Sequence, residues 1–518
     1  MRFRGRGQVV RKRWIAPAAL VVAAVASGCL VGPNYSTPKS DVAPQYLPSP
    51  AASPTPLNAA DAYWWRSLGD PVLDGLVESV YLNNLTLQLA GVRVLQARAQ
   101  LNQSIGNLFP QQQGLSGAIG WNQVNTPVTV NRWDDNILFA ATWEIDVWGK
   151  IRRGIEADRA AYLGTVATYD DVLVTVIADT ATSYVNARTA EERLRVAAKN
   201  VETQKESLRV ASVQFQYGET SELDVRQAAT LLAQTQAQIP SLQNSLRQAK
   251  DALAVLLGTT PESVDARLAG GAGIPVTPAE ATVGIPKDLL RRRPDVRSAG
   301  LAAASQSALI GVAVAQMYPS FSLTGAFGFA STNLASSSLA DMFSWQNRVA
   351  QAGASFFFPV FNYGRLVNQV RVQDAVFQEA VLNYQNTVLK AQQEVEDGLS
   401  SFATSQEALV NFTTAASASA RATELSILQY KAGETTYTTV LTSEQSELAI
   451  EDSLAQTKGN VALGLISVYR ALGGGWELRG DRDVVSDEVK AEMERRTNWG
   501  KMLETAQHMP KTSPVEEP

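Results

Sequence analysis

The 518-residue sequence predicts a mainly α-helical protein that also contributes strands to a membrane β-barrel. The prediction depends on three observations: paired motifs that mark an internal duplication, very long stretches without helix breakers, and segments in which apolar and polar residues alternate. Together they predict two structural repeats per chain, residues 63–260 and 286–477, joined by a linker over 261–285. Each repeat is expected to hold short helices, a β-hairpin and a long helical hairpin.

The duplication is visible in glycine motifs that recur at one spacing. The motif Gln-Phe-Gln-Tyr-Gly-Glu-Thr-Ser, with its glycine at Gly218, returns as Gln-Tyr-Lys-Ala-Gly-Glu-Thr-Thr, with its glycine at Gly433. Gly149 in Asp-Val-Trp-Gly-Lys corresponds to Gly364 in Phe-Asn-Tyr-Gly-Arg at the same spacing. A third pair, Leu-Phe-Pro in the first half and Met-Tyr-Pro in the second, precedes them in the same order. Agreement of three separated motifs indicates duplication more strongly than any single match.

The N-terminus is typical of an exported lipoprotein. Residues 1–28 carry six basic residues and then an apolar run that is too short to span a bilayer but suits a signal peptide. The run ends in Ala-Ser-Gly before Cys29, which resembles a bacterial lipobox, so we expect an N-acyl and diacylglycerol lipid on Cys29 and no other cofactor. Leu30 follows in place of the aspartate that retains such lipoproteins at the inner membrane. The alternative is a signal peptide cut nearby, with Cys29 incidental.

Residues 29–62 are rich in Pro, Ser and Ala, which is typical of an extended tether. The first long stretch after the tether region, between Gly149 and Gly218, contains no proline and predicts one helix of roughly 100 Å at about 1.5 Å per residue. Its counterpart in the second half has apolar residues every seven positions, typical of a coiled-coil seam. Because a second helix returns after each glycine, we expect helical hairpins over about 149–258 and about 364–473. The alternative is an ordinary amphipathic helix in a globular domain.

Two segments predict β-hairpins, over about 112–148 and about 319–363. Residues 137–147 alternate strictly, with apolar side chains on one face and with Glu144 and Asp146 on the other. An apolar-out, polar-in pattern with aromatic residues suits an outer-membrane strand, so we expect both carboxylates to face the lumen. An acid/base pair is the other interpretation, but no cleft or basic partner accompanies the two residues.

Four strands per chain predict an oligomer. The unpaired edges of four strands would lie in hydrocarbon, at a cost of several kcal/mol for each unsatisfied backbone group. Two chains would give eight strands and a barrel filled by side chains, whereas three would give twelve strands and an open lumen. A conduit therefore favours three chains. The alternative is a small soluble sheet on a non-conducting coiled-coil scaffold.

The composition excludes several classes of function. Cys29 and His508 are the single cysteine and histidine, so the chain can form neither an intrachain disulfide nor a Cys/His zinc site. His508 lies in a polar tail, where we expect a solvated residue rather than a general base. We find no phosphate-binding loop and no metal-ligand spacing, so we expect neither an enzyme nor a metal site. The net charge of −5, which becomes more negative without the basic leader, argues against nucleic acid as a partner.

Two further charged segments have structural interpretations. The Arg-Arg-Arg-Pro-Asp run at 291–295 could suggest an anion-binding patch, but we expect a solvated junction at which Pro294 starts a helix. Residues 478–518 are charged and lie outside the repeats, so we expect a flexible or surface-wrapping tail.

Motifs along nearly all of residues 29–477 resemble those of TolC/OprM-type outer-membrane efflux proteins of the lipoprotein (NodT-like) branch. The matching motifs are Val31–Tyr35, Trp64-Trp65, Gly69–Pro71, Leu108–Pro110, Leu289–Val296, Tyr318–Thr324 and Ala471–Glu477. The resemblance implies a homotrimer whose twelve-stranded barrel crosses the outer membrane and whose twelve-helix tunnel crosses the periplasm. It also implies docking by a periplasmic adaptor and feeding by an inner-membrane pump of the resistance-nodulation-division (RND) class.

The resemblance assigns the glycine turns, at Gly218 and Gly433, to the periplasmic tip, where the pore closes and the adaptor docks. Asp224 matches the acidic gate position of the first half, and Tyr430 matches a tyrosine that pairs with it. The sequence departs from the TolC pattern at the positions that follow in the second half. The residues in place of an arginine and two gate aspartates are Thr435, Thr439 and Thr442. We therefore expect a tip held by hydrogen bonds and packing, with weaker attraction for cations.

The leading hypothesis is a lipid-anchored outer-membrane exit duct for drugs or other small molecules. Its alternatives are the outer-membrane component of type I protein secretion, with the same architecture, and the non-conducting scaffold. The lipobox and the Arg-Arg-Pro-Asp motif favour efflux, and the strand alternation argues against a scaffold. The sequence does not name the exported substrate.

Overall fold

The structure is a computed structural model. It describes residues 30–48, 52–53, 61–125, 127, 129–271, 273–284, 286, 292–333 and 339–504. The signal peptide, Cys29 and His508 lie outside the described residues. The chain forms two compact units, which we describe separately. One holds residues 96–164 and 299–384 with the start of the chain to Pro38, and the other holds residues 39–95, 165–298 and 385–518.

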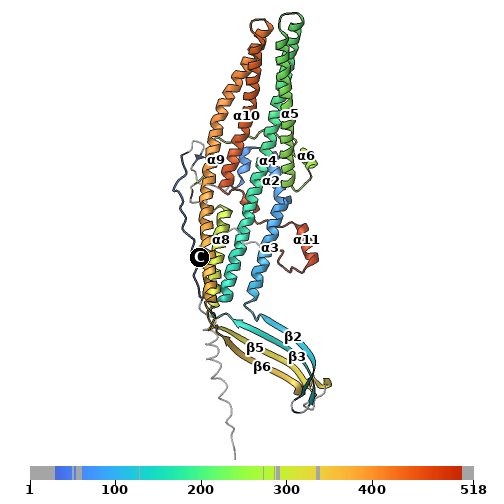
Figure 1. The fold of residues 1–518 in the computed structure, drawn as a ribbon, viewed down its shortest axis with the longest axis vertical. Helices are drawn as coiled ribbons and strands as arrows, with labels where there is room; N and C mark the ends of the chain where they lie inside the picture. The colour runs from blue at the N-terminus through green and yellow to red at the C-terminus, as the bar shows by residue number, and fades with distance from the viewer. Residues whose placement is uncertain are drawn as a thin grey trace, which may run out of the picture. The chain divides into compact units, whose positions relative to one another are not determined.

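The first unit contains a four-stranded antiparallel sheet (Figure 1). Its strands are β2 (Gln112–Asn125), β3 (Thr129–Ile145), β5 (Ser320–Thr332) and β6 (Arg348–Phe357), in the order β2-β3-β5-β6. The hairpins of the two repeats are joined through β3 and β5, with Ile137 opposite Phe329. Within the described part of the chain, β2 and β6 are therefore the two edges of the sheet.

One face of this sheet carries large apolar side chains without cover. Leu115, Phe139 and Phe327 lie opposite one another on three adjacent strands, and each is about half exposed or more. Trp143 lies opposite Leu323 four residues along, on the same face, and both are also exposed. A single chain leaves this apolar face in contact with solvent, which is unfavourable for a soluble protein.

The second unit contains most of the two long helical hairpins (Figure 1). Helix α4 (Lys150–Gln216) has 67 residues and is followed by α5 (Glu222–Leu256). Helix α9 (Arg365–Lys431) also has 67 residues and is followed by α10 (Tyr437–Ala471). The equal lengths of α4 and α9 agree with the duplication that the glycine motifs indicate.

The apolar seam of α9 is buried over only part of its length. Tyr384, Val395 and Phe402 are at most 5% exposed, whereas Val367, nearer the strands in sequence, is 39% exposed. Seven-residue spacing keeps these positions on one side of the helix. The seam positions near the strands therefore stay exposed in the single chain.

Shorter elements cover the long helices. Helix α2 (Pro71–Asn83) starts at the N-cap Asp70, whose side chain accepts a hydrogen bond from the Val72 backbone N–H at 2.9 Å. The two longer helices of this group are α3 (Leu85–Gly106), which follows α2, and α8 (Pro294–Ala315), which begins at Pro294. The linker holds the short helix α6 (Val264–Leu268) and strand β4 (Ala281–Thr282), which pairs in parallel with β1 (Ala52–Ser53).

The N-terminal segment is fixed to the helices by hydrogen bonds. In the first unit, the buried Arg153 donates to the backbone oxygens of Val31 and Gly32 and to the side chain of Asn34. In the second unit, Gln392 of α9 accepts from the Ala43 N–H at 3.0 Å and donates to the Asp41 oxygen at 3.0 Å. The described part of the expected tether is thus extended but not free.

The described part of the C-terminal segment, residues 478–504, packs on the fold, which fits the surface-wrapping alternative and not the flexible one. The turn η5 (Trp476–Arg479) leads to α11 (Asp487–Arg496). Arg482 lies over the Tyr81 ring at 5.1 Å, and Val484 passes so close to Gly91 that a Cβ there would lie 1.9 Å from its oxygen. Two valines make this contact, and the many charged residues around them gave no indication of it in the sequence.

Two helices, α4 and α8, contain windows that are long and apolar enough to cross a membrane by length and composition. In α4, 56% of the window is buried inside the structure. A core helix of a soluble domain passes the same test, so this observation alone assigns neither helix to a membrane.

Candidate functional site

The two hairpin turns share one backbone geometry. Gly218 and Gly433 have φ values of 81° and 72°, in the left-handed region that side chains other than glycine's rarely adopt. The Glu219 N–H donates to the Gln214 oxygen at 2.9 Å, and the Glu434 N–H donates to the Gln429 oxygen at 2.9 Å. Both are the six-to-one bonds of a Schellman turn. The motif repeated in sequence is therefore a repeated helix stop.

Below these turns, side chains from all four long helices meet in one buried cluster, which we call the tip cluster. Its buried members are Ala211 of α4, Ala228 of α5, Tyr430 of α9 and both Tyr437 and Val440 of α10. The rings of Tyr430 and Tyr437 pack edge to face, with centroids 5.4 Å apart and planes at 65°. The cluster is the apolar contact that holds the two hairpins together at this end.

Asp224 lies in the first turn of α5, at the edge of the tip cluster. The Thr220 hydroxyl donates a short hydrogen bond to Asp224, and the Ser221 hydroxyl lies 3.5 Å from its other oxygen. The Tyr430 hydroxyl is buried without a hydrogen-bond partner among the described residues. Burial raises the pKa of Tyr430, Thr220 opposes the rise, and the Asp224 carboxylate adds to it. The structure thus brings Asp224 and Tyr430 into electrostatic contact, with Thr220 between them.

The threonines of the second turn bond locally. The Thr435 hydroxyl donates to the Thr439 hydroxyl at 3.0 Å, and Thr442 donates to the backbone oxygens of Thr438 and Thr439, both at 3.0 Å. Each of these bonds stays within one turn of α10 or its entry. Within a single chain these hydroxyls stabilise the helix start and do not bridge the hairpins.

Hydrogen bonds and ion pairs join the two hairpins beside and below the tip cluster. Lys431 of α9 lies 3.3 Å from the Glu206 carboxylate of α4, and the Gln214 side chain donates to the Tyr430 backbone oxygen at 3.2 Å. Further down, Arg193 of α4 forms a two-pronged bond with Asp452 of α10, at 2.7 and 2.9 Å. Exposed ion pairs of this kind contribute at most about 1 kcal/mol each to stability, so the apolar cluster contributes most to holding the hairpins together.

The carboxylates expected on the lumen face of the strand occupy different places. Glu144 is in β3, where Lys150 lies 3.0 Å from its carboxylate. Asp146 lies beyond the end of β3 and accepts hydrogen bonds from the backbone N–H groups of Ile151 and Arg152 at 3.1 and 2.9 Å. Placing Asp146 on the strand face was therefore wrong, because its carboxylate binds the free N–H groups at the start of α4.

A second site lies where the Arg-Arg-Pro-Asp motif meets the long helices. Asp170 of α4 is fully buried, and Arg479 lies 2.8 Å from it and Arg297 3.8 Å. Arg293 pairs with Asp295 and with Glu394 of α9, both at 2.7 Å. This ionic junction ties the first repeat to the second within one unit, in agreement with a structural rather than an anion-binding interpretation. The expectation that the junction is solvated was wrong, because Arg293 is buried among its ion pairs.

A small cavity of about 190 Å³ adjoins this ionic junction. It is lined by Asp171, Arg293, Glu394 and Arg470 among others. Burial, followed by the neighbouring Asp295 carboxylate, raises the pKa of Asp171 to about 6. Acidic and basic side chains alternate around the cavity, so it offers no surface of one charge to a ligand.

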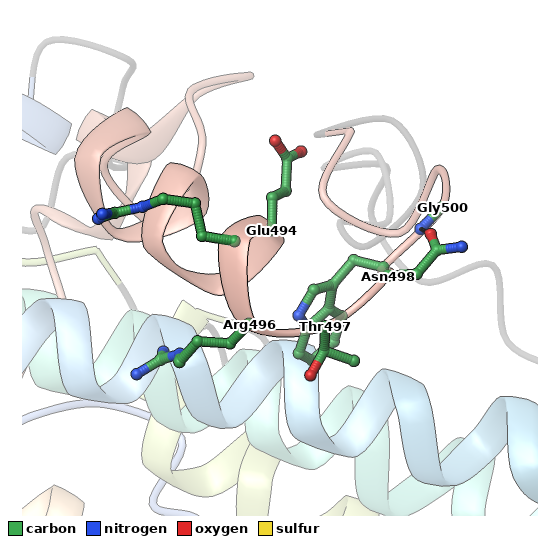
Figure 2. Close-up of a pocket in the computed structure, with 7 residues that line it drawn as sticks. Glu494, Arg496, Thr497, Asn498 and Gly500 are labelled. Atoms are coloured by element: carbon green, nitrogen blue, oxygen red, sulfur yellow. Dashed lines mark hydrogen bonds between the residues drawn. The ribbon is translucent and has the colours of Figure 1, made fainter.

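Another hollow lies at the end of α11, lined by the consecutive residues 494–500 (Figure 2). The side chains of Glu494 and Arg496 extend in different directions and do not converge on a point (Figure 2). Among the described residues, no group of three or more His, Cys, Asp or Glu side chains could hold a metal ion. Neither hollow therefore has the features of a catalytic or metal site.

Comparison with known proteins follows the same division into two repeats. The sequence matches the family model described as outer membrane efflux protein over residues 76–259 and 285–474, which is most of the chain and falls in both halves. The chain belongs to the outer membrane efflux protein family. The match to each half separately agrees with the duplication.

Relatives of this efflux protein match over nearly their whole length. Nodulation protein T of Rhizobium leguminosarum bv. viciae is 29% identical over 460 residues, covering 89% of this chain and 93% of the relative. Cation efflux system protein CusC of Escherichia coli is 28% identical, and the match covers 88% of this chain and 98% of CusC. The solved outer-membrane channel OprN is 31% identical with a TM-score of 0.81, covering 87% of this chain and all of that one. The resemblance to the NodT-like branch is thereby confirmed.

Sequence reasoning missed two buried residues of this efflux protein's α10. Tyr437 and Glu444 are each 1% exposed, although both lie in a stretch rich in polar residues. The spacing of seven from Tyr437 to Glu444 would have placed them on one helix face. A buried glutamate contradicts what its residue type predicts, so the sequence alone gave no reason to select it.

Proposed function

We propose that the protein is the outer-membrane exit duct of a tripartite efflux system, through which small molecules pass passively to the exterior. The observation that carries the proposal is the family match in both halves together with a four-stranded sheet that exposes an apolar face. The names of the relatives, a cation efflux protein and an outer-membrane channel, support the same function. Catalysis forms no part of the proposal.

The duct would be a homotrimer with a twelve-stranded barrel and a twelve-helix tunnel. Strands β2 and β6 are edges in the described chain, and an edge within hydrocarbon leaves backbone groups unsatisfied. Joining β6 of one copy to β2 of the next removes every edge, and three copies leave an open lumen. The exposed part of the α9 seam near the strands, including Val367, would be covered by a neighbouring copy in the same assembly.

The tip cluster and the turns around it would form the gate and the adaptor-docking end. Tyr430 and Tyr437 supply packing, and Asp224 accepts a hydrogen bond from the Thr220 hydroxyl. Thr435, Thr439 and Thr442 form hydrogen bonds within their own chain segment. The gate would therefore depend on apolar packing more than on ion pairs. Gly218 and Gly433 would set the sharp turns that present this end to the adaptor.

The proposed partners are two further copies of the chain, a periplasmic adaptor, an inner-membrane RND pump and the outer membrane itself. Cys29 would carry the N-acyl and diacylglycerol lipid that anchors the N-terminal segment. Glu144 remains a candidate for the lumen surface, where the positive charge of Lys150 partly offsets its negative charge. The choice of exported molecule would lie with the pump.

Planar-bilayer recording of the purified full-length protein tests the proposal, together with its mass in detergent. We expect trimers that conduct once the tip is opened by urea or by a tip substitution. A monomeric protein, or trimers without conductance under any of these conditions, would contradict the duct. Co-purification with an ATP-driven exporter instead of an RND pump would favour type I secretion, the second candidate.

A further inference from the structure

A buried carboxyl group lies between α4 and α10, about two turns below the ring of Tyr437. Glu444 is 1% exposed, and the Ser207 hydroxyl of α4 donates a short hydrogen bond to its Oε1 atom. The other oxygen, Oε2, has no hydrogen-bond partner among the described residues. An ionised carboxylate in this position would lose its hydration without gaining a counter-charge, which is costly.

The opposite helix supplies a second unpartnered polar group. Gln204 is 2% exposed and lies one turn from Ser207 on the same face of α4. Neither its Oε1 nor its Nε2 atom has a hydrogen-bond partner within the described part of the chain. A protonated Glu444 is both a donor and an acceptor, whereas an ionised one only accepts. The Ser207 hydroxyl bonds one oxygen of Glu444, and the buried Gln204 amide supplies no compensating hydrogen bond to an ionised carboxylate, so the site favours the neutral acid.

Among the described residues, no cation pairs with Glu444. The nearest charge on its own helix is Glu447, whose negative charge repels an ionised Glu444. Lys199 of α4 lies 2.6 Å from Glu451 and 3.4 Å from Glu447, so its charge is directed to those two side chains.

The remaining ionisable groups at this level act elsewhere. They are Lys431 of α9 and Arg209 of α4, both paired with Glu206, Tyr437 of α10, and Asp224 of α5, which acts on Tyr430 and Tyr437. Burial raises the pKa of Tyr437, and the neighbouring Glu444 carboxylate adds to the rise.

We propose that Glu444, with Ser207 and Gln204, forms a proton-binding site that regulates how firmly α4 and α10 are held together below the tip. Burial raises the pKa of Glu444 to about 7, Glu447 adds to the rise, and the Ser207 hydrogen bond opposes it. Because the folded-state pKa lies above the unfolded one, the proton stabilises the contact fully below the unfolded value. That stabilisation is lost as pH rises through about 7.

The consequence for conduction rests on the proposed duct function. Helices α4 and α10 both contribute to the tip cluster, so a weaker contact between them favours an open tip. Above the pKa, each further pH unit can change the ratio of closed to open chains by up to about tenfold. The duct would therefore open more readily in alkaline than in acidic surroundings.

The proton site is tested directly by pH-difference infrared spectroscopy of the purified full-length protein, which reports protonated carboxyl groups. Wild-type protein is expected to lose a buried carboxyl band with a midpoint near pH 7, above the loss expected for Asp170 and Asp171 near pH 6, and Glu444→Gln is expected to lack that band. Gln has the shape of the neutral acid, so this variant is expected to fold. Glu447→Gln removes a repelling charge and is expected to move the loss of the band to lower pH. Glu202→Gln, on the exposed side of α4, is the matched control that leaves the band in place.

Three results separate the possibilities. A band that survives in Glu444→Gln, or that is absent from wild type, overturns the proton site. Bilayer conductance that stays constant from about pH 6 to pH 8 in wild type overturns the regulatory role, whereas a rise that Glu444→Gln abolishes supports it. Absence of conductance at every pH, with the titrating band intact, counts against the duct function and leaves the proton site supported.

Discussion

Replacing Tyr437 by alanine tests whether apolar packing holds the tip closed. Tyr437 is 1% exposed and packs edge to face on Tyr430, with ring centroids 5.4 Å apart. Removing a buried aromatic side chain typically costs about 3–5 kcal/mol, of which the ring pair itself supplies about 0.5–1.5 kcal/mol. If the tip cluster exists only in the closed tip, a loss of about 3 kcal/mol lowers the ratio of closed to open chains by roughly 150-fold.

The assay is single-channel recording of the purified protein in planar bilayers at one fixed pH. We expect Tyr437→Ala to open the duct far more often than wild type. Tyr217→Ala is the matched control, because Tyr217 lies in the first turn and is 80% exposed, and it is expected to conduct like wild type. Folding is checked by the mass of the trimer in detergent. Correctly assembled Tyr437→Ala trimers that stay as closed as wild type would refute the reasoning.

Three further predictions concern other parts of the chain. Arg479→Met leaves the fully buried Asp170 with only the more distant Arg297, so it is expected to destabilise the protein by about 3–5 kcal/mol. The loss is measured as a lower midpoint of thermal unfolding, and an unchanged midpoint would contradict the ionic junction. Cys29→Ser is expected to abolish palmitate labelling, and labelling that survives would refute the anchor. Gly91→Ala is expected to detach the C-terminal segment, detected as faster proteolysis after residue 480, whereas wild-type protease resistance would contradict the close contact at Gly91.

The long helices and the strands could be predicted because their signals repeat over many residues. Proline-free stretches and seven-residue spacing are redundant, so single polar residues do not obscure them. The two glycines, Gly218 and Gly433, mark the turns because few other residues adopt a positive φ. The family resemblance rests on several motifs together, and the comparisons confirm it.

Other features depend on single contacts between segments distant in sequence, which no local pattern encodes. Asp146 continues the alternation of the strand in sequence, but its carboxylate accepts hydrogen bonds from backbone N–H groups at the start of α4. Glu444 is polar by type and buried by position, so only the facing helix reveals its environment. The charged composition after residue 478 predicts a tail, yet two valines in it fit a glycine on α3.

The hydrogen bonds between the N-terminal segment and α9 have a consequence for how this protein can evolve. Along residues 39–47, the backbone of the segment bonds to side chains of α9 through the Lys39 and Asp41 oxygens and the Ala43 and Leu47 N–H groups. Almost any residue but proline at the donor positions can supply the same groups. The segment can therefore change in sequence while its path along the helix is inherited, and substitutions on α9, at Gln392 above all, are the ones that would displace it.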